Sequence, residues 1–219
     1  MREISIYTVS ALNLFILVRY CWLLYRKEIK PALAMWLFFT IAVGMSLITY
    51  MAEGDHGFLD NILNTTDIIY VSTVALAIFI WGDNSSKLTK FDTGCLVAVL
   101  LIVLFWIITK NHTITNICIQ GIMVISYFPV VKRLLEAKEN TEPFSVWIIM
   151  MLTPAISLLS SKGILATIYS VRAIICVAVL IILMLRAEFL SRKGGKISAR
   201  SLDCPAPFGS IGREKPEQQ

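Results

Sequence analysis

The segment that decides the fold is "AKENTEPFSVW", residues 137–147, together with its counterpart "RKEIKPALAMW", residues 26–36. In both segments a Lys-Glu pair comes shortly before a Trp. The distance along the sequence from Lys27 to Lys138 is the same as that from Trp36 to Trp147, and this distance is called the offset below. Extending this offset aligns residues 17–49 with residues 128–160 and gives seven identities in 33 positions. We infer an internal repeat of helix, loop and helix. The identical pairs are Leu23 and Leu134, Leu24 and Leu135, Lys27 and Lys138, Glu28 and Glu139, Trp36 and Trp147, Ser46 and Ser157, and Leu47 and Leu158.

The composition is that of a membrane protein. Of the 219 residues, 57% are hydrophobic and 16% are charged, whereas a soluble domain needs more charge to cover its surface. The apolar residues fall into runs that approach the length of about 20 residues needed for a transmembrane helix. No run alternates apolar and polar residues as the strands of a membrane barrel do. We therefore predict an all-α, polytopic membrane protein with seven transmembrane helices. They lie at about residues 6–25, 33–51, 59–81, 95–109, 113–135, 144–160 and 163–185.

The charges of the loops predict the orientation. Lys and Arg are frequent after the first, third and fifth helices and in the tail, whereas the loop after the second helix carries acids. By the positive-inside rule, the amino terminus is outside and the carboxyl terminus is cytoplasmic. Attraction of the basic side to anionic lipid accounts for the pI near 9.0, so we expect the bilayer and no nucleic acid as a partner.

The repeat and the orientation together predict how the helices are grouped. The offset superposes the first helix on the fifth and the second on the sixth, and the fourth helix has no counterpart. Because the first and fifth helices cross in the same direction, the halves form a parallel repeat about an axis along the membrane normal. The tail is polar and rich in Gly, Pro and charge, which predicts disorder. The predicted units are a triple-helix bundle, a linker helix, a second triple-helix bundle and the disordered cytoplasmic tail, at residues 1–85, 86–110, 111–190 and 191–219.

The segment "QGIMVISYFPVVKRLLEAKENTEPFSVW", residues 120–147, resembles the SWEET and PQ-loop transporter superfamily, with nicotinamide riboside transporters as relatives. The shared pattern is a Pro in the first helix of a bundle, a basic inner loop and an aromatic restart. The resemblance covers nearly the whole chain in topology, and in motif the fifth and sixth helices. It implies a small-solute transporter with prolines as hinges. The matching positions are Pro129 and Pro154 in the second half, and Val18 and Val43 in the first.

The two prolines also have a meaning of their own. Each removes one amide donor and crowds the carbonyl a turn earlier, so each can kink its helix and permit rocking. Pro129 and Pro154 are therefore the predicted hinge residues. The alternative is that they have no mechanical role, because membrane helices tolerate Pro in general.

Polar residues within the predicted helices form one layer. Counted at about 1.5 Å per residue, Asn13, Asp67, Gln120 and Arg172 lie roughly 10 to 13 Å below the outer surface. An acid or base that faces lipid costs several kcal/mol, so Asp67 and Arg172 should face the interior. We hypothesise that these two side chains pair across the axis between the halves. The pair would contact a charged or zwitterionic substrate, form a gate, or hold the halves in register as a structural ion pair.

This layer is the predicted binding site for a small-molecule substrate. Its predicted residues are Asn13, Asp67, Tyr70, Gln120, Tyr169 and Arg172, where each tyrosine lies about one turn from a charged residue. Neither a metal nor another cofactor is expected, because His56 and His112 lie in predicted outer loops and no helix carries a cluster of His and carboxylates.

The functional prediction is a membrane transporter, either a facilitator or a proton-coupled carrier, that works by alternating access. The alternative is a seven-helix sensor or a substrate-binding subunit that transports nothing itself. An enzyme is not expected, because the sequence has no Gly-x-Ser-x-Gly element and no phosphate-binding loop. A homo-oligomer is compatible with the resemblance, since dimers are common in related folds.

Overall fold

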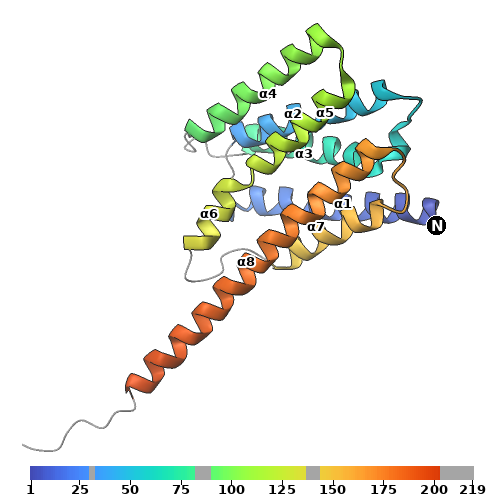
Figure 1. Ribbon diagram of the computed structural model, residues 1–219. Coiled ribbons are helices and arrows are strands. Elements are labelled where there is room, and N and C mark those ends of the chain that lie inside the picture. Colours follow the sequence, from blue (N-terminus) through green and yellow to red (C-terminus); the bar gives the residue numbers. More distant parts are fainter. Residues whose placement is uncertain (30–32, 82–89, 137–143, 203–219) are drawn as a thin grey trace, which may run out of the picture.

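The computed structural model describes residues 1–29, 33–81, 90–136 and 144–202, and this part of the chain consists of helices and turns (Figure 1). The predicted all-α class is confirmed for these residues. The elements are α1 (Arg2–Tyr25), α2 (Leu33–Glu53), a short 3₁₀ turn η1 (Phe58–Asn61), α3 (Ile62–Trp81), α4 (Lys90–Thr109), α5 (His112–Ile125), α6 (Phe128–Glu136), α7 (Phe144–Ser157) and α8 (Ile164–Leu202).

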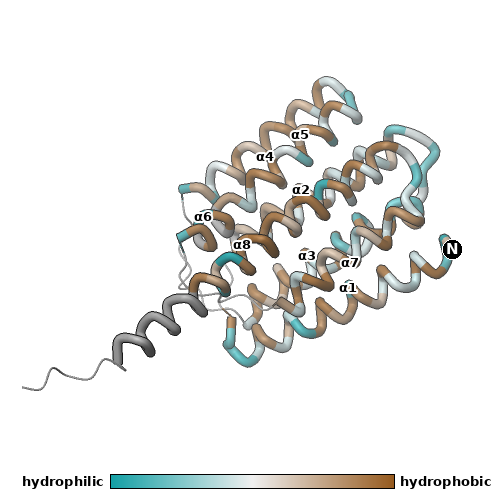
Figure 2. The backbone as a smooth tube through the Cα atoms, turned by 60° about the horizontal axis from the view of Figure 1, so that its bottom comes forward, coloured by the Kyte–Doolittle hydropathy of each residue, from teal (hydrophilic) through white to brown (hydrophobic). Residues whose placement is uncertain are grey.

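Five of the described helices are long and apolar enough to cross a membrane: α1, α2, α3 with its η1 turn, α4, and α8 as far as Leu190. α5 and α7 are apolar but have only 14 residues each. Figure 2 shows hydrophobic residues along most of the length of the helices, with hydrophilic residues gathered toward their ends. Large apolar side chains also cover the outside of the molecule, for example Phe79 and Ile108, each 73% exposed. Such a surface suits hydrocarbon and not water, so the protein is an integral membrane protein.

Most helix ends lie within about five residues of the prediction, and two helices differ in a larger way. The predicted helix at residues 113–135 is interrupted at Ser126 and Tyr127, which separate α5 from α6. In addition, α8 continues to Leu202, into the first part of the tail that was predicted to be disordered. The remainder of that tail, residues 203–219, lies outside the described residues.

Within each of the two predicted groups of helices, α1 to α3 and α5 to α8, one helix packs on all the others. α3 packs on both α1 and α2, and α8 packs on α5, α6 and α7. Between the groups, α1 packs on α7 and α2 packs on α5, while α4 lies against α5 and α2. The last helix of each group therefore contacts the other members of its group. The contacts between the groups run mainly from α1 to α7 and from α2 to α5, with smaller ones from α3 to α7 and α8.

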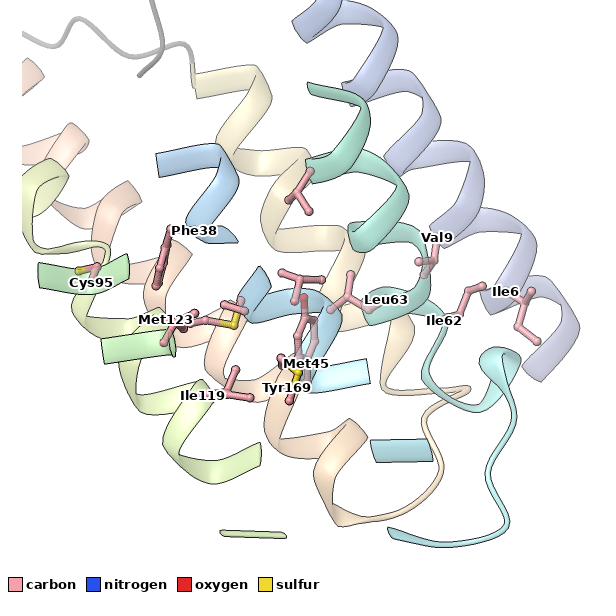
Figure 3. Close-up of a cluster of buried hydrophobic side chains, with 14 residues drawn as sticks. Ile6, Val9, Phe38, Met45, Ile62, Leu63, Cys95, Ile119, Met123 and Tyr169 are labelled. Carbon is pink, nitrogen blue, oxygen red and sulfur yellow. The ribbon is translucent and has the colours of Figure 1, made fainter. Parts of the chain in front are cut away.

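The largest hydrophobic core joins these groups. It contains Val9 of α1, Val43 of α2, Val99 of α4, Ile119 of α5 and Tyr169 of α8, none of which is more than 2% exposed. Figure 3 shows Tyr169 in this cluster, beside Met45 and Ile119. The phenol of Tyr169 is thus packed among apolar side chains, and it carries a polar hydroxyl into the interior.

Candidate functional site

Three of the predicted binding-site residues, Asn13, Asp67 and Tyr169, meet at the carboxylate of Asp67. The Tyr169 hydroxyl donates to Asp67 Oδ2 at 2.8 Å, and Asn13 Nδ2 donates to Asp67 Oδ1 at 3.1 Å. Asn13 also donates to the hydroxyl of Thr66 at 2.6 Å. These contacts connect α1, α3 and α8, so the structure brings together residues from both predicted halves of the chain. They hold the carboxylate in one position.

Arg172 belongs to the same site, but it does not pair with Asp67. Its guanidinium carbon lies 4.8 Å from the centre of the Tyr169 ring, and the ion pairs found between described residues do not include Arg172. Tyr169 thus separates the two charges, with its hydroxyl on the acid and its ring beside the base. The hypothesis of a direct Asp67–Arg172 pair is wrong in this structure.

The environment of Arg172 is energetically unusual. The residue is only 8% exposed, and its Nε is buried without a hydrogen-bond partner among the described residues. A cation over an aromatic ring gains about 0.5 to 2 kcal/mol, while the burial of an ion costs several kcal/mol. Its Tyr169 contact therefore offsets only part of the cost of burying this charge.

Gln120 lies in a second polar cluster, formed by buried side chains of α2, α3 and α5. Gln120 Nε2 donates to the Ser46 hydroxyl at 2.9 Å and to Asn116 Oδ1 at 3.2 Å. Asn116 Nδ2 in turn donates to the Ser46 carbonyl at 2.8 Å, and the Asn64 amide lies 3.0 Å from the Ser46 hydroxyl. Gln120 Oε1 is buried without a partner in the described part of the chain. Ser46 is thus the centre of this cluster.

Tyr70, the remaining predicted site residue, lies in an aromatic group. Its ring centroid is 5.6 Å from that of Trp36 and 6.3 Å from that of Tyr20, in both cases edge to face. Tyr20 and Trp36 are also 5.0 Å apart. Since Tyr70 follows Asp67 by three positions on α3, the group lies one helical turn from the carboxylate.

Hydrogen bonds between the groups of helices repeat with the offset of the sequence. Ser5 on α1 and Ser160, just after α7, join their hydroxyls at 2.9 Å. Asn116 on α5 donates to the Thr49 hydroxyl of α2 at 2.9 Å. The offset of the repeat takes Ser5 to Asn116, and it also takes Thr49 to Ser160. The two contacts are therefore the same contact made in both directions, as in a symmetric interface.

The serine that is repeated in the sequence has a similar role in both groups. Ser46 on α2 lies within hydrogen-bond distance of Asn64 on α3, and Ser157 on α7 is bonded to Ser170 on α8 at 2.8 Å. In each group, the repeated serine connects the second helix to the third.

A charged cluster closes the end of the molecule at which the amino terminus lies. Asp60 Oδ1 accepts Arg2 Nη2 at 2.5 Å and Lys162 Nζ at 3.0 Å, and its Oδ2 accepts the backbone N–H of Gly57 at 2.9 Å. The Lys162 amide donates to the Asp60 carbonyl at 2.8 Å, and the Tyr50 hydroxyl donates to the Lys162 carbonyl at the same distance. This cluster, here called the Asp60 clasp, joins α1, η1 and the loop between α7 and α8 (Figure 1).

The two predicted hinge prolines occupy different places. Pro129 is the second residue of α6, directly after the interruption at Ser126 and Tyr127. Because Pro has no amide hydrogen, it cannot bond to the carbonyl of Ile125, and the helix is broken at this point. Pro154, by contrast, is buried inside the continuous helix α7.

Neither a scan against protein-family models nor searches of curated proteins and of solved structures give a match for this chain. The site must therefore be interpreted from its own geometry. Within the described ranges, no three His, Cys, Asp or Glu side chains lie close enough together to share a metal ion.

Sequence reasoning missed three parts of this arrangement. The role of Ser46 was detectable, because Ser46 and Ser157 are among the seven identities of the repeat. Asn116 was detectable as well, since it lies one turn before Gln120 on the same face of a helix. The role of Asp60 has no signal in the sequence beyond its acidic loop, because its partners come from distant parts of the chain, one near the amino terminus and one in the second half.

Proposed function

We propose that this protein carries a small polar solute across the membrane by alternating access, with seven crossings arranged as two parallel groups of three helices. In this proposal α1, α2 and α3 form the first group, α5 with α6, α7 and α8 form the second, and α4 is the linker. The amino terminus is outside and the carboxyl terminus is cytoplasmic. Carriers built from repeats generally bind their substrate between the repeats.

The observation that carries this proposal is the reciprocal pair of hydrogen bonds, Ser5 with Ser160 and Asn116 with Thr49. Two equivalent units that meet through equivalent contacts form a symmetric interface, and in this proposal they rotate against each other about its axis. The polar site at Asp67 lies between these units, because Asp67 of α3 accepts hydrogen bonds from Asn13 of α1 and from Tyr169 of α8. The arrangement thus combines a pair of movable units with a polar site at the interface between them.

Alternating access requires one state that is closed on the outer side and one that is open there. The contacts of the Asp60 clasp are those of a state closed on the outer side. It ties Lys162, of the second unit, to Asp60 and Tyr50, of the first. With the proposed orientation, these contacts close the outer side of the site. Opening to the outside would break the Lys162 contacts and leave those between Arg2 and Asp60 intact, because the latter lie within one unit.

The experiment that tests this function is uptake by proteoliposomes. The purified full-length chain is reconstituted, and entry of radiolabelled sugars, amino acids, carboxylic acids and nucleosides is measured at two external pH values. Uptake above that of empty liposomes supports the proposal, and a dependence on the pH gradient would identify proton coupling. Binding of a solute without uptake would overturn it in favour of a sensor or binding subunit.

A matched pair of variants makes this assay specific to the site. Asp67→Asn keeps the size of the side chain and removes its charge, so uptake should fall by at least tenfold. Asp55→Asn makes the same change at an exposed acid in the loop before η1, and uptake should stay within twofold of the unaltered protein.

A further inference from the structure

Arg172 is a buried cation that makes no direct ion pair with a described acid. Its 8% exposure places it in the interior, and its Nε has no partner among the described residues. The polar groups beside it are the phenols of Tyr169 and Tyr127, which are neutral. The Tyr127 hydroxyl is within hydrogen-bonding reach of the guanidinium, and Nε remains without a partner in the described part of the chain. Buried charges in proteins are as a rule paired, so this Nε is available to a group from outside the chain.

The nearest candidate partner, Asp67, is already engaged. Its two carboxylate oxygens accept from Tyr169 and from Asn13. The Tyr169 side chain lies between the acid and the base, with its hydroxyl at one and its ring at the other. Movement of Arg172 onto Asp67 would require the Tyr169 ring to leave a position where the residue is 1% exposed.

The geometry of the guanidinium favours one class of ligand. Its Nε is unpartnered among the described residues, and Nε with a neighbouring Nη forms a planar fork that can bind two oxygens of one group side by side, which matches a carboxylate. A doubly charged phosphate fits this site less well, because it would bring two negative charges next to a single cation and close to Asp67. A neutral sugar or nucleoside would leave the cation uncompensated.

We propose that Arg172 binds the carboxylate of the transported solute, so that the substrate is a small carboxylate-bearing molecule. This inference rests on the proposed function and names its substrate class. Asp67 lies on the other side of Tyr169, where its carboxylate accepts from Tyr169 and Asn13. In this proposal the carboxylate of the solute therefore meets Arg172 and not Asp67.

The test is binding to the purified full-length protein in detergent, followed by thermal unfolding. The probes are matched pairs that differ in the carboxylate alone: L-alanine and L-alaninamide, propionate and propionamide. Inorganic phosphate, glucose and uridine complete the panel. The expected result is a rise in unfolding temperature with at least one carboxylate and none with its amide. Stabilisation by phosphate, glucose or uridine alone, or by no carboxylate, would overturn the inference.

Two variants separate a substrate contact from a structural role. Arg172→Met removes the charge and keeps most of the volume, so the cost of burying a cation without a direct ion-pair partner disappears with it. The unfolding temperature without solute should therefore be unchanged or higher, and the shift with the carboxylate should disappear. A lower unfolding temperature together with a retained carboxylate shift would show that Arg172 is structural. Arg186→Met, at an exposed arginine that donates to the Leu135 carbonyl, is the control and should keep the shift.

The two proposals can fail independently. Carboxylate binding that depends on Arg172, with no uptake in proteoliposomes, would support the inference and overturn transport. Uptake of glucose or uridine, without any carboxylate-dependent shift, would support transport and overturn the inference.

Discussion

Ser5 and Asn116 occupy equivalent positions of the internal repeat, and they hydrogen-bond to Ser160 and Thr49, which are equivalent to each other in the same way. The residue types differ at both pairs of equivalent positions, Ser5 with Asn116 and Thr49 with Ser160, and the contact is nevertheless preserved. A repeat of sequence is thus accompanied by a repeat of contacts, and each group of helices uses its first helix to hold the second helix of the other. The two groups are therefore equivalent in the contacts that they make with each other at these positions.

Cysteine cross-linking should detect this equivalence. In a chain from which the five native cysteines have been removed, Ser5→Cys with Ser160→Cys and Thr49→Cys with Asn116→Cys should both form disulfides on mild oxidation. Both pairs of side chains touch in the structure, which brings the β-carbons near the distance that a disulfide needs. Gel mobility with and without a reducing agent measures the product.

The control for this cross-linking is the pair Ser5→Cys with Thr49→Cys, which combines one residue from each contact. It should remain reduced under the same conditions. Cross-linking of only one of the two native pairs would contradict the equivalence of the units.

The Asp60 clasp should contribute measurably to stability. Asp60→Asn removes the charge that meets Arg2 and Lys162, while the amide can still accept one hydrogen bond. The side chain of Asp60 is 13% exposed, whereas those of Arg2 and Lys162 are 42% and 56% exposed. Ion pairs of such exposure contribute about 0.2 to 1 kcal/mol each, so the variant should lose roughly 1 to 2 kcal/mol of unfolding free energy. Denaturation in mixed detergent micelles measures this loss.

The same substitution should also open the clasped end. In a chain without its native cysteines, Ser5→Cys should react slowly with a thiol reagent, because Ser5 is 1% exposed. Addition of Asp60→Asn should accelerate that reaction, whereas addition of Asp55→Asn should not. Equal rates in all three proteins would mean that the clasp does not restrict access.

The sequence was sufficient to predict most helices, because apolar length alone defines them. It also predicted that Asn13, Asp67, Gln120 and Arg172 share a depth; the structure brings Asn13 to Asp67 and places Tyr169 between Asp67 and Arg172, while Gln120 lies in the cluster centred on Ser46. Depth does not determine the direction in which a side chain points around its helix axis, since successive residues turn by about 100°. For that reason the direct Asp67–Arg172 pair was predicted wrongly, and the position of Gln120 in a separate cluster was not foreseen.

The contacts between groups were beyond sequence reasoning for a different reason. Ser46 and Ser157 are identical and attract notice, but Ser5 and Asn116 differ and gave no sign of their common role. The interruption at Ser126 and Tyr127 is not marked by the apolar run, which continues through it, but Pro129 two residues later is a signal for it.

Removal of one hydroxyl should test the link between Asp67 and Arg172. Tyr169→Phe keeps the ring beside Arg172 and removes the donor to Asp67 Oδ2. Hydrogen bonds to charged groups contribute about 1.5 to 3 kcal/mol in soluble proteins, and those between membrane helices average about 0.6 kcal/mol. A loss of roughly 1 to 2 kcal/mol in unfolding free energy is expected from these values, and uptake should fall with it. Tyr7→Phe, at a tyrosine that is 71% exposed, should change neither quantity.

The interruption between α5 and α6 should depend on Pro129. In Pro129→Ala the new amide can bond to the Ile125 carbonyl, which would allow α5 and α6 to join into one helix across Ser126 and Tyr127. Hydrogen exchange followed by mass spectrometry should then show slower exchange in a peptide spanning this interruption. If the interruption serves as a hinge, the joined helix should be stiffer, and uptake should fall while stability is kept or increased. Pro154→Ala is the comparison, because Pro154 already lies inside a continuous helix, and exchange there should change less. Unaltered exchange at Ser126 and Tyr127 in Pro129→Ala would mean that packing against α8, and not the missing amide hydrogen, maintains the break.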